Sequence, residues 1–340
     1  MPPSIAPMGV RGMPAKPGEQ PEEEFGTGLS AVGSPKAPHS ANRTQRGGAG
    51  SVAHGLLRGL RPRQWVKNIL VFAAPGAAGA LGKLHPTLVT IGVFFLFSAV
   101  AGGTYLLNDS LDAEADRAHP TKRNRPIASG QVPVAVAVVV GIGLLVASSI
   151  GAWLLAGMGL TLVIAAYAVI TLSYSAFLKH EPIVDLAAVA AGFVLRAVAG
   201  GVATHVYISD WFLIVTSFTS LFMVTGKRYA EFRDLGKGRM AHRPSLGGYT
   251  LGYLRSIRTA SASVSLTAYC LWAFERSQQV PSGAVMFELS IIPFVLSILR
   301  YGLLVDQGQG GAPEEIVLGD RRLQVLGMIW ALTFALGVYL

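Results

Sequence analysis

Asn108-Asp109-Ser110-Leu111-Asp112-Ala113-Glu114-Ala115-Asp116 closes a long apolar run and carries the spacing from which fold and function are best inferred. On an α-helix, at about 100° per residue, Asp109, Asp112 and Asp116 fall within about 60° of one another, in a single stripe of carboxylates. Unpaired carboxylates repel one another and are costly near a membrane, so such a stripe requires a cation. Ligands that are all oxygen favour Mg²⁺, which typically bridges substrate phosphates. The stretch therefore predicts a magnesium site formed by Asn108, Asp109, Asp112 and Asp116.

Basic residues follow this motif directly, at Arg117, Lys122, Arg123 and Arg125. Acids that hold a metal beside bases that hold an anion indicate a diphosphate site at a membrane surface. The alternative is an acidic helix end that is solvated at the interface, with bases placed only by membrane topology. The stripe spacing and the adjoining bases together favour the metal–phosphate site.

The composition is that of a membrane protein. The chain has 340 residues, of which 51% are hydrophobic and 14% charged, and its mean hydropathy is +0.47. A soluble protein would expose too much of this apolar surface to water. The single cysteine, Cys270, excludes an intrachain disulfide and a cysteine metal cluster. No nucleotide-binding loop or hydrolase motif occurs in a credible setting, and nothing in the basic pattern indicates nucleic-acid binding.

Nine apolar segments are long enough, or nearly so, to span a bilayer, which predicts an all-α polytopic bundle with a polar cavity facing the cytosol. Residues 1–55 are rich in Pro, Gly, Ser and Ala without apolar periodicity, so we expect a disordered cytosolic tail before a nine-helix membrane domain at 56–340. The predicted spans cover residues 65–81, 87–107, 132–151, 154–172, 184–203, 209–225, 256–274, 284–304 and 322–340.

The charges of the connections predict the orientation. Those at 108–131, 173–183, 226–255 and 305–321, with their flanks, carry most of the basic residues between spans, whereas the opposite connections carry only Lys83 and Arg276. This bias puts the N-terminus in the cytosol and the C-terminus outside. The aspartate motif then faces the cytosol in a multi-pass protein of the inner (plasma) membrane.

Asp185 and Arg196 are two charges within one predicted span. They lie about 20° out of phase on a helix and about 16 Å apart along its axis. An unpaired guanidinium near mid-membrane is costly, so Arg196 should face the bundle interior or a wet cavity. Two interpretations stay open and can coexist: an internal ion pair that locks two helices, or a role in a polar cavity.

Two further basic segments flank predicted spans. Arg61-Pro-Arg63-Gln-Trp65-Val-Lys67-Asn68 opens the first span, where basic residues and Trp commonly anchor a chain at the interface. Lys67 and Asn68 lie deeper, so an anionic substrate is the alternative partner for them. Lys227 and Arg228, after the sixth span, are likewise either topology signals or phosphate ligands.

The motif, its continuation and the nine predicted spans resemble the UbiA superfamily of intramembrane prenyltransferases. The continuation reads Asp116-Arg-x-His-Pro-x-Lys-x-Asn-Arg-Pro-Ile-Ala-Ser-Gly130. The resemblance implies an all-helical bundle, open laterally to lipid, that binds a diphosphate through Mg²⁺. It also implies that Asp109, Asp112 and Asp116 are the catalytic residues.

Most members that use a prenyl diphosphate carry a second aspartate-rich motif after the sixth span, where this chain has Gly226-Lys-Arg-Tyr-Ala-Glu231. This segment instead resembles a phosphoribose-transferring branch, as do residues 61–68, Tyr174-Ser-x-x-Leu-Lys179 and Gly192-Phe-Val-Leu-Arg-Ala197. That resemblance implies Mg²⁺-dependent transfer of 5-phosphoribose from phosphoribosyl pyrophosphate (PRPP) to decaprenyl phosphate, a polyprenyl phosphate, with release of pyrophosphate. The product would lead to the lipid-linked arabinose donor of cell-wall arabinan.

The same resemblance implies roles for the polar residues. A lipid phosphate is already ionised near pH 7, so no strong general base is required. For the 5-phosphate, the order of preference is Lys179 with Tyr174, then Lys67, then Lys227 with Arg228. The expected substrate-binding set is Lys67, Asn68, Asn108, Arg117, Lys122, Arg125, Tyr174, Lys179, Asp185, Arg196, Lys227 and Arg228.

Two other functions stay open. An aromatic or quinone-ring prenyltransferase of the same fold would use a polyprenyl diphosphate and no PRPP. An ion-coupled transporter would use Asp185 and Arg196 as midplane charges, although no inverted repeat of interrupted helices supports it. The main interpretation implies PRPP, a polyprenyl phosphate and the membrane as partners, and it leaves open whether the chain forms a homo-oligomer.

Overall fold

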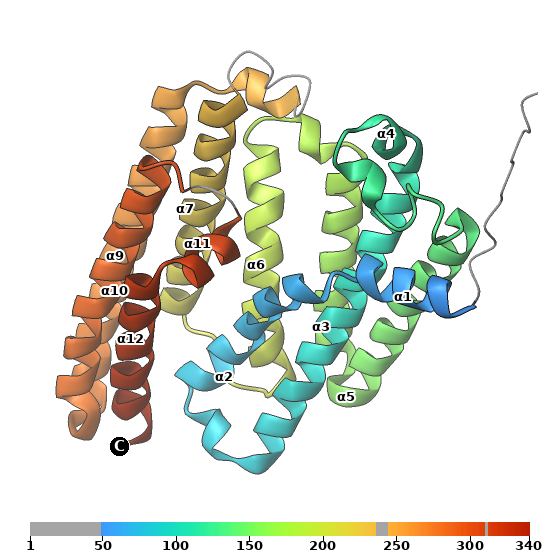
Figure 1. The fold of residues 1–340 in the computed structure, drawn as a ribbon. Helices are drawn as coiled ribbons and strands as arrows, with labels where there is room; N and C mark the ends of the chain where they lie inside the picture. The colour runs from blue at the N-terminus through green and yellow to red at the C-terminus, as the bar shows by residue number, and fades with distance from the viewer. Residues whose placement is uncertain (1–48, 236–243, 310–311) are drawn as a thin grey trace, which may run out of the picture. The chain divides into compact units, whose positions relative to one another are not determined.

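The computed structural model describes residues 49–235, 244–309 and 312–340, and all secondary structure assigned in these ranges is helical (Figure 1). The predicted all-α class is therefore confirmed. The 3-10 helices are η1 (Pro62–Phe72), η2 (Ala80–Gly82), η3 (Lys122–Asn124), η4 (Leu178–His180), η6 (Pro244–Gly248) and η7 (Pro281–Gly283). The α-helices are α1 (Ala49–Gly59), α2 (Ala73–Ala77), α3 (Leu84–Leu111), α4 (Ala113–Ala118), α5 (Val134–Ala176), α6 (Val184–Ala203), α7 (Asp210–Leu235), α9 (Leu251–Gln279), α10 (Ala284–Asp306), α11 (Pro313–Gly319) and α12 (Arg321–Tyr339).

Most predicted spans correspond to long helices. The spans at 87–107, 184–203, 284–304 and 322–340 match α3, α6, α10 and α12. Both spans predicted at 132–151 and 154–172 lie in α5, whose helical geometry is interrupted at Ala156 and Gly157. Gly157 has a φ of 74°, a conformation that costs glycine little because it lacks a Cβ.

The number of membrane crossings differs from the nine predicted. Within the described ranges, five segments are both long and apolar enough to cross: α3, α5, α6, α10 with η7, and α12. α7 and α9 are long enough but more polar, and they hydrogen-bond each other through the hydroxyls of Thr219 and Ser265 at 2.6 Å. The chain has the helices of a multi-pass membrane protein, but the count of nine is not confirmed.

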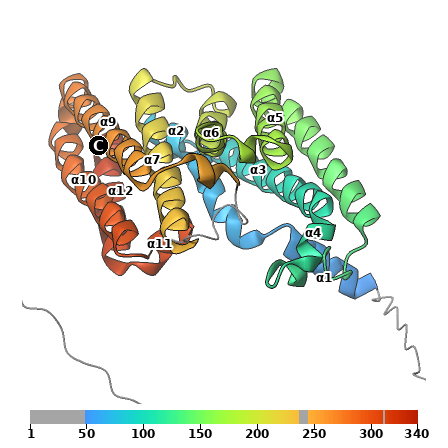
Figure 2. The same ribbon diagram turned by 90° about the horizontal axis from the view of Figure 1, so that it is seen from above.

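Helix α6 lies between two groups of helices, with α7, α9 and α10 on one side and α3 and α5 on the other (Figure 2). Its first half contributes Leu186 and Ala190 to a buried apolar cluster with α7, α9 and α10. Its second half contributes Ala199 and Ala203 to another cluster with η1, α3 and α5. Because one helix belongs to both clusters, α6 fixes the two groups of helices against each other.

The span predicted at 65–81 is not a single α-helix. It consists of η1, α2 and η2, and η1 is preceded by Arg61 in the left-handed region, with a φ of 53°. A 3-10 helix rises about 2 Å per residue, so η1 advances about 22 Å where an α-helix would advance about 16 Å. α1 begins at Ala49, so the predicted tail boundary at residue 55 falls inside a helix, and residues 1–48 of that tail lie outside the described ranges.

Gly200 of α6 determines how closely η1 approaches the centre of the bundle. A Cβ at this position would collide with the carbonyl oxygen of Val71 in η1. We expect Gly200→Ala to destabilise the protein by about 1–3 kcal/mol, because backbone rather than a flexible side chain must move. Thermal melting in detergent measures the effect. Gly143→Ala in α5 is the control, since nothing lies within 4 Å of the added methyl group, and equal melting of the two variants would contradict the close approach.

Candidate active site

The helix that carries the aspartate motif ends within it. α3 stops at Leu111, and Asp112 has φ −87° and ψ 2° before α4 begins. Asp109 and Asp116 therefore lie on consecutive helices, and the predicted stripe of three carboxylates on one helix is not formed. Asn108 is half-buried in the last turn of α3. Within the described ranges, no group of three His, Cys, Asp or Glu side chains is placed to hold a metal ion.

Arginine side chains nevertheless bring two of the aspartates together. Nη1 of Arg125 donates to Oδ1 of Asp109 at 3.1 Å and to Oδ2 of Asp116 at 2.7 Å. Nη2 of Arg61 donates to both oxygens of Asp109, at 2.7 and 2.9 Å. Both aspartates are buried. Two oxygens bonded to one nitrogen lie within about 6 Å of each other, so the carboxylates of Asp109 and Asp116 converge.

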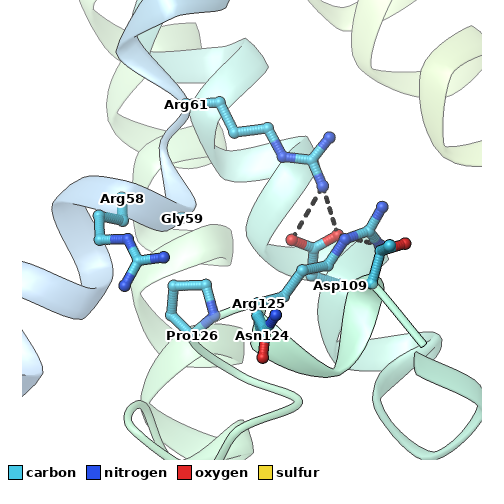
Figure 3. A pocket seen from close by; sticks show the side chains of 8 residues that line it. Arg58, Gly59, Arg61, Asp109, Asn124, Arg125 and Pro126 are labelled. Carbon is cyan, nitrogen blue, oxygen red and sulfur yellow. Dashed lines mark hydrogen bonds and ion pairs between the residues drawn. The ribbon is translucent and has the colours of Figure 1, made fainter. Parts of the chain in front are cut away.

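A pocket of about 280 Å³ opens beside Asp109 (Figure 3). Three arginines against one carboxylate give it a net positive lining, which suits a phosphorylated ligand. Arg58 and Arg61 are missing from the sequence-predicted set, although the run Arg58-x-x-Arg61-x-Arg63 before the first apolar segment is a signal for them. The lining residues are Arg58, Gly59, Arg61, Asp109, Thr121, Asn124, Arg125 and Pro126.

The other predicted residues of the motif and its loop have different partners. Nζ of Lys179 in η4 lies 3.7 Å from Oδ1 of Asp112, so this third aspartate is paired away from the other two. Nε of Arg117 donates to the carbonyl oxygen of Ala128 at 3.3 Å, which ties α4 to the loop after it. Lys122 is exposed in η3.

Asp185 is fully buried, and its charged partner is Arg228 rather than Arg196. Nε of Arg228 donates to Oδ2 of Asp185 at 2.9 Å, and the hydroxyls of Ser245 and Tyr249 donate to the same carboxylate. Burial and the hydrogen bond to Asp185 raise the pKa of the Tyr249 phenol, which keeps it a donor. Asp185 thus forms an internal ion pair that locks α6 to α7, one of the two interpretations left open, while Arg196 takes no part in it.

Arg228 is enclosed by this network. It is 2% exposed, and it donates to the Tyr174 hydroxyl at 3.1 Å and to Glu231 at 3.2 Å. Burial acts to lower the pKa of the Arg228 guanidinium, but Glu231, Tyr174 and Asp185 outweigh it and raise that pKa. Three predicted substrate-binding residues, Tyr174, Asp185 and Arg228, are thus brought together as one another's partners. Lys227, the next residue before, is partly exposed, with its Nζ 4.0 Å from Glu231.

Arg196 lies in a second buried network. Its Nε donates to Oδ1 of Asn68 at 2.7 Å, Nη2 to the Tyr167 hydroxyl at 2.8 Å, and Nη1 to the carbonyl oxygen of Gly192 at 2.7 Å. Its guanidinium also lies 4.6 Å from the centroid of the Tyr167 ring. Asn68 donates in turn to the hydroxyl of Ser98 at 3.0 Å. The predicted residues Asn68 and Arg196 therefore join η1 to α3, α5 and α6.

Lys67 faces a carboxylate that the sequence does not single out. Its Nζ lies 3.0 Å from Oε1 of Glu314 on α11. Glu314 and Glu315 follow Pro313, and acids directly after such a proline are ordinary at a helix start. Only the folded chain reveals that one of these two acids is turned toward η1.

The donor set at Asp109 and Asp116 fits Mg²⁺. Magnesium is usually held in proteins by one or two carboxylates together with waters and substrate phosphates, not by a complete protein cage. Asp109 and Asp116 supply two converging carboxylates, and the pocket that Asp109 lines has room for phosphate oxygens. The guanidinium groups of Arg61 and Arg125 balance the two carboxylates in this structure. Asn108 and Asp112, the other predicted ligands, are not part of the converging pair formed by Asp109 and Asp116.

Comparisons with known proteins agree on one family. A model of the UbiA prenyltransferase family matches residues 69–312. The decaprenyl-phosphate phosphoribosyltransferase of Corynebacterium glutamicum is 45% identical over 294 residues, covering 85% of this chain and 88% of that protein. Its namesake from Mycobacterium tuberculosis is 46% identical over 288 residues, covering 84% and 94%.

Solved structures agree on the fold. A UbiA homologue from Archaeoglobus fulgidus bound to GPP and Mg²⁺ superposes with a TM-score of 0.63 at 18% identity, covering 84% of this chain and 99% of that one. At such low identity the likeness concerns the helical architecture alone.

Proposed function

The chain belongs to the UbiA prenyltransferase family, and from this premise we propose that it transfers 5-phosphoribose from PRPP to decaprenyl phosphate with release of pyrophosphate. It is then a transferase that acts on a polyprenyl phosphate, at a step toward the lipid-linked arabinose donor of cell-wall arabinan. The observation that carries the proposal is that the match to decaprenyl-phosphate phosphoribosyltransferases extends over most of the chain rather than over the aspartate motif alone.

The pocket beside Asp109 is the proposed site of the pyrophosphate end of PRPP. Arg58, Arg61 and Arg125 line it, and guanidinium groups match phosphate oxygens in pairs. Mg²⁺ held by Asp109 and Asp116 would neutralise charge on the departing pyrophosphate. Because Arg61 and Arg125 contact the carboxylates and line the pocket, a phosphate bound there lies beside both positive side chains.

The reaction forms a bond from a lipid phosphate oxygen to C1 of the ribose as the bond from C1 to pyrophosphate breaks. The lipid phosphate is ionised near pH 7, so the chain need not remove a proton from it. Its task is to hold two anionic substrates in line against their mutual repulsion. Lys67, Lys179 and Lys227 are partly exposed and suited to this. Tyr174 accepts a hydrogen bond from the buried Arg228, so Lys179 and Lys67 become the preferred partners of the 5-phosphate.

We place the aspartate motif on the cytosolic side of the inner (plasma) membrane, where the water-soluble PRPP is found, and the positive-inside pattern supports this orientation. The alternative, a prenyltransferase that uses a polyprenyl diphosphate, is less well supported. After the sixth predicted span this chain has the buried Arg228, bonded to Asp185, in place of a second aspartate-rich motif.

The direct test is pyrophosphate release by the purified protein in detergent, with PRPP, polyprenyl phosphate and Mg²⁺ omitted one at a time. We expect release only when all three are present. Turnover of a polyprenyl diphosphate with an aromatic acceptor, and none with PRPP, would establish the alternative.

Arg61→Gln should raise the KM for PRPP about tenfold while changing kcat less, because it removes one charged contact from the proposed pyrophosphate site. Steady-state rates of pyrophosphate release at varied PRPP measure both constants. Arg63→Gln is the matched control, because Arg63 is an exposed arginine of the same segment that does not line the pocket. Equal KM values for the two variants would remove Arg61 from the site.

A further inference from the structure

A second charged cluster lies beside the middle of η1, around the side chain of Glu314, which faces Lys67. This side chain is 10% exposed, and the side chain of Lys67, whose Nζ lies 3.0 Å from Oε1, is 20% exposed. Both carboxylate oxygens are buried, and neither has a well-aligned hydrogen-bond donor among the described residues, although Nζ of Lys67 lies 3.0 Å from Oε1. Glu314 is thus a buried anion held chiefly by the charge of Lys67.

This is a poor environment for a permanent carboxylate. Burial would raise the pKa of Glu314, but Lys67, with a smaller contribution from Lys227, holds that pKa below its ordinary value. The group therefore stays ionised at neutral pH. A buried acceptor without hydrogen bonds costs free energy, and native proteins rarely retain one. Lys67 and Lys227 favour a negative charge at this position. The Glu314 carboxylate supplies that charge but leaves hydrogen-bonding capacity unused.

Two buried hydroxyls on helices that contact α11 are also without partners among the described residues. They are Oγ1 of Thr225 on α7 and the phenol of Tyr301 on α10. Tyr301 lies within electrostatic range of Glu314, and its ring lies 3.5 Å from the point where a Cβ on Gly226 would stand. A hydroxyl can donate one hydrogen bond. An anion with more oxygens than a carboxylate could satisfy groups that Glu314 leaves unpaired.

We propose that Glu314 holds, in the free protein, the place of a phosphate monoester that binds at Lys67. The inference rests on the proposed function, whose two substrates both carry such a group: the lipid acceptor and the 5-phosphate end of PRPP. A phosphate monoester carries about −1.5 to −2 charges and three acceptor oxygens, against one charge and two oxygens for Glu314. Arg61 and Lys67 lie about 12 Å apart along η1, so one element serves both the pocket and this subsite.

An internal anion that must leave before the ligand binds lowers the apparent affinity, because only the fraction of molecules with Lys67 available is competent. Glu314→Gln keeps the shape of the side chain and removes its charge. It should therefore tighten binding of the monoester that uses this subsite about fivefold. Glu315→Gln is the matched control, since Glu315 is the exposed neighbour on the same helix.

The measurement is titration calorimetry of the full chain in detergent, without turnover, using farnesyl phosphate in one arm and ribose 5-phosphate in the other. Tighter binding of either ligand by Glu314→Gln, with Glu315→Gln unchanged, supports the proposal and identifies the source of the phosphate. Unchanged or weaker binding of both ligands overturns it. Should Glu314→Gln fail to purify, Glu314→Asp withdraws the carboxylate by one methylene, and the same increase or its absence decides.

Lys67→Gln separates competition from a merely structural role. In Lys67→Gln, Glu314 no longer competes with the phosphate monoester for an ammonium group. Adding Glu314→Gln to this variant should therefore leave the affinity for the monoester unchanged. Tighter binding in the double variant would overturn the assignment to Lys67. Because binding is measured without PRPP, a wild-type protein that binds these ligands but releases no pyrophosphate would refute the proposed function while leaving this inference to be decided by its own variants.

Discussion

Asp109→Asn is expected to reduce pyrophosphate release roughly a thousandfold. The variant keeps the volume of the side chain but removes the buried charge that faces Arg61 and Arg125. In the proposed site this charge helps to hold the metal ion against the pyrophosphate of PRPP, so its loss acts on the transition state as well as on substrate binding. Steady-state kinetics at saturating PRPP, lipid phosphate and Mg²⁺ measure the loss.

Glu114→Gln is the matched control for this variant. Glu114 lies between Asp109 and Asp116 in the chain, but its side chain is exposed on α4, so its activity should stay within twofold of the wild type. Melting in detergent shows whether Asp109→Asn still folds. A folded Asp109→Asn protein that keeps more than a tenth of the wild-type rate would refute the assignment of Asp109 to the metal and pyrophosphate.

The long helices could be predicted because apolar runs of this length have few alternatives in a membrane protein. The prediction for 184–203 reproduced α6 at both ends. The segment 65–81 could not be predicted as η1, α2 and η2, because the close approach of η1 to Gly200 of α6 joins elements that are distant in the sequence. The loop predicted from residue 226 was wrong for a related reason: Tyr229, Ala230 and Phe232 are buried, which carries α7 on to Leu235.

In the candidate site, the contact made by Arg125 is local in the sequence, whereas the contact made by Arg61 is not. The local spacing placed acids of the motif beside bases of the following loop as metal and phosphate ligands, and in the folded chain Arg125 bonds to Asp109 and Asp116 directly. Arg61 lies in a segment typical of a membrane anchor, and local spacing does not reveal that its backbone turns its side chain toward Asp109. Pairings between distant elements are set by the packed fold and leave no trace in local spacing.

Arg228→Met should destabilise the protein by about 3–5 kcal/mol, because it leaves the fully buried Asp185 carboxylate without its charged partner. Methionine has a similar length and no charge, so loss of the ion pair dominates over loss of packing volume. A fall in melting temperature of roughly 10 °C in detergent is expected. Arg63→Met, at an exposed position, is the control and should melt within about 2 °C of the wild type.

The double variant Asp185→Leu with Arg228→Met distinguishes a structural pair from a substrate-binding arginine. Replacing both members of a buried ion pair by apolar side chains is often close to neutral, so the double variant should recover part of the stability that Arg228→Met loses. Recovery is expected to be incomplete, because the hydroxyls of Ser245 and Tyr249 also donate to Asp185 and would lose their acceptor. If Arg228→Met instead melts like the wild type and raises the KM for PRPP, Arg228 binds substrate and the network around it opens during turnover.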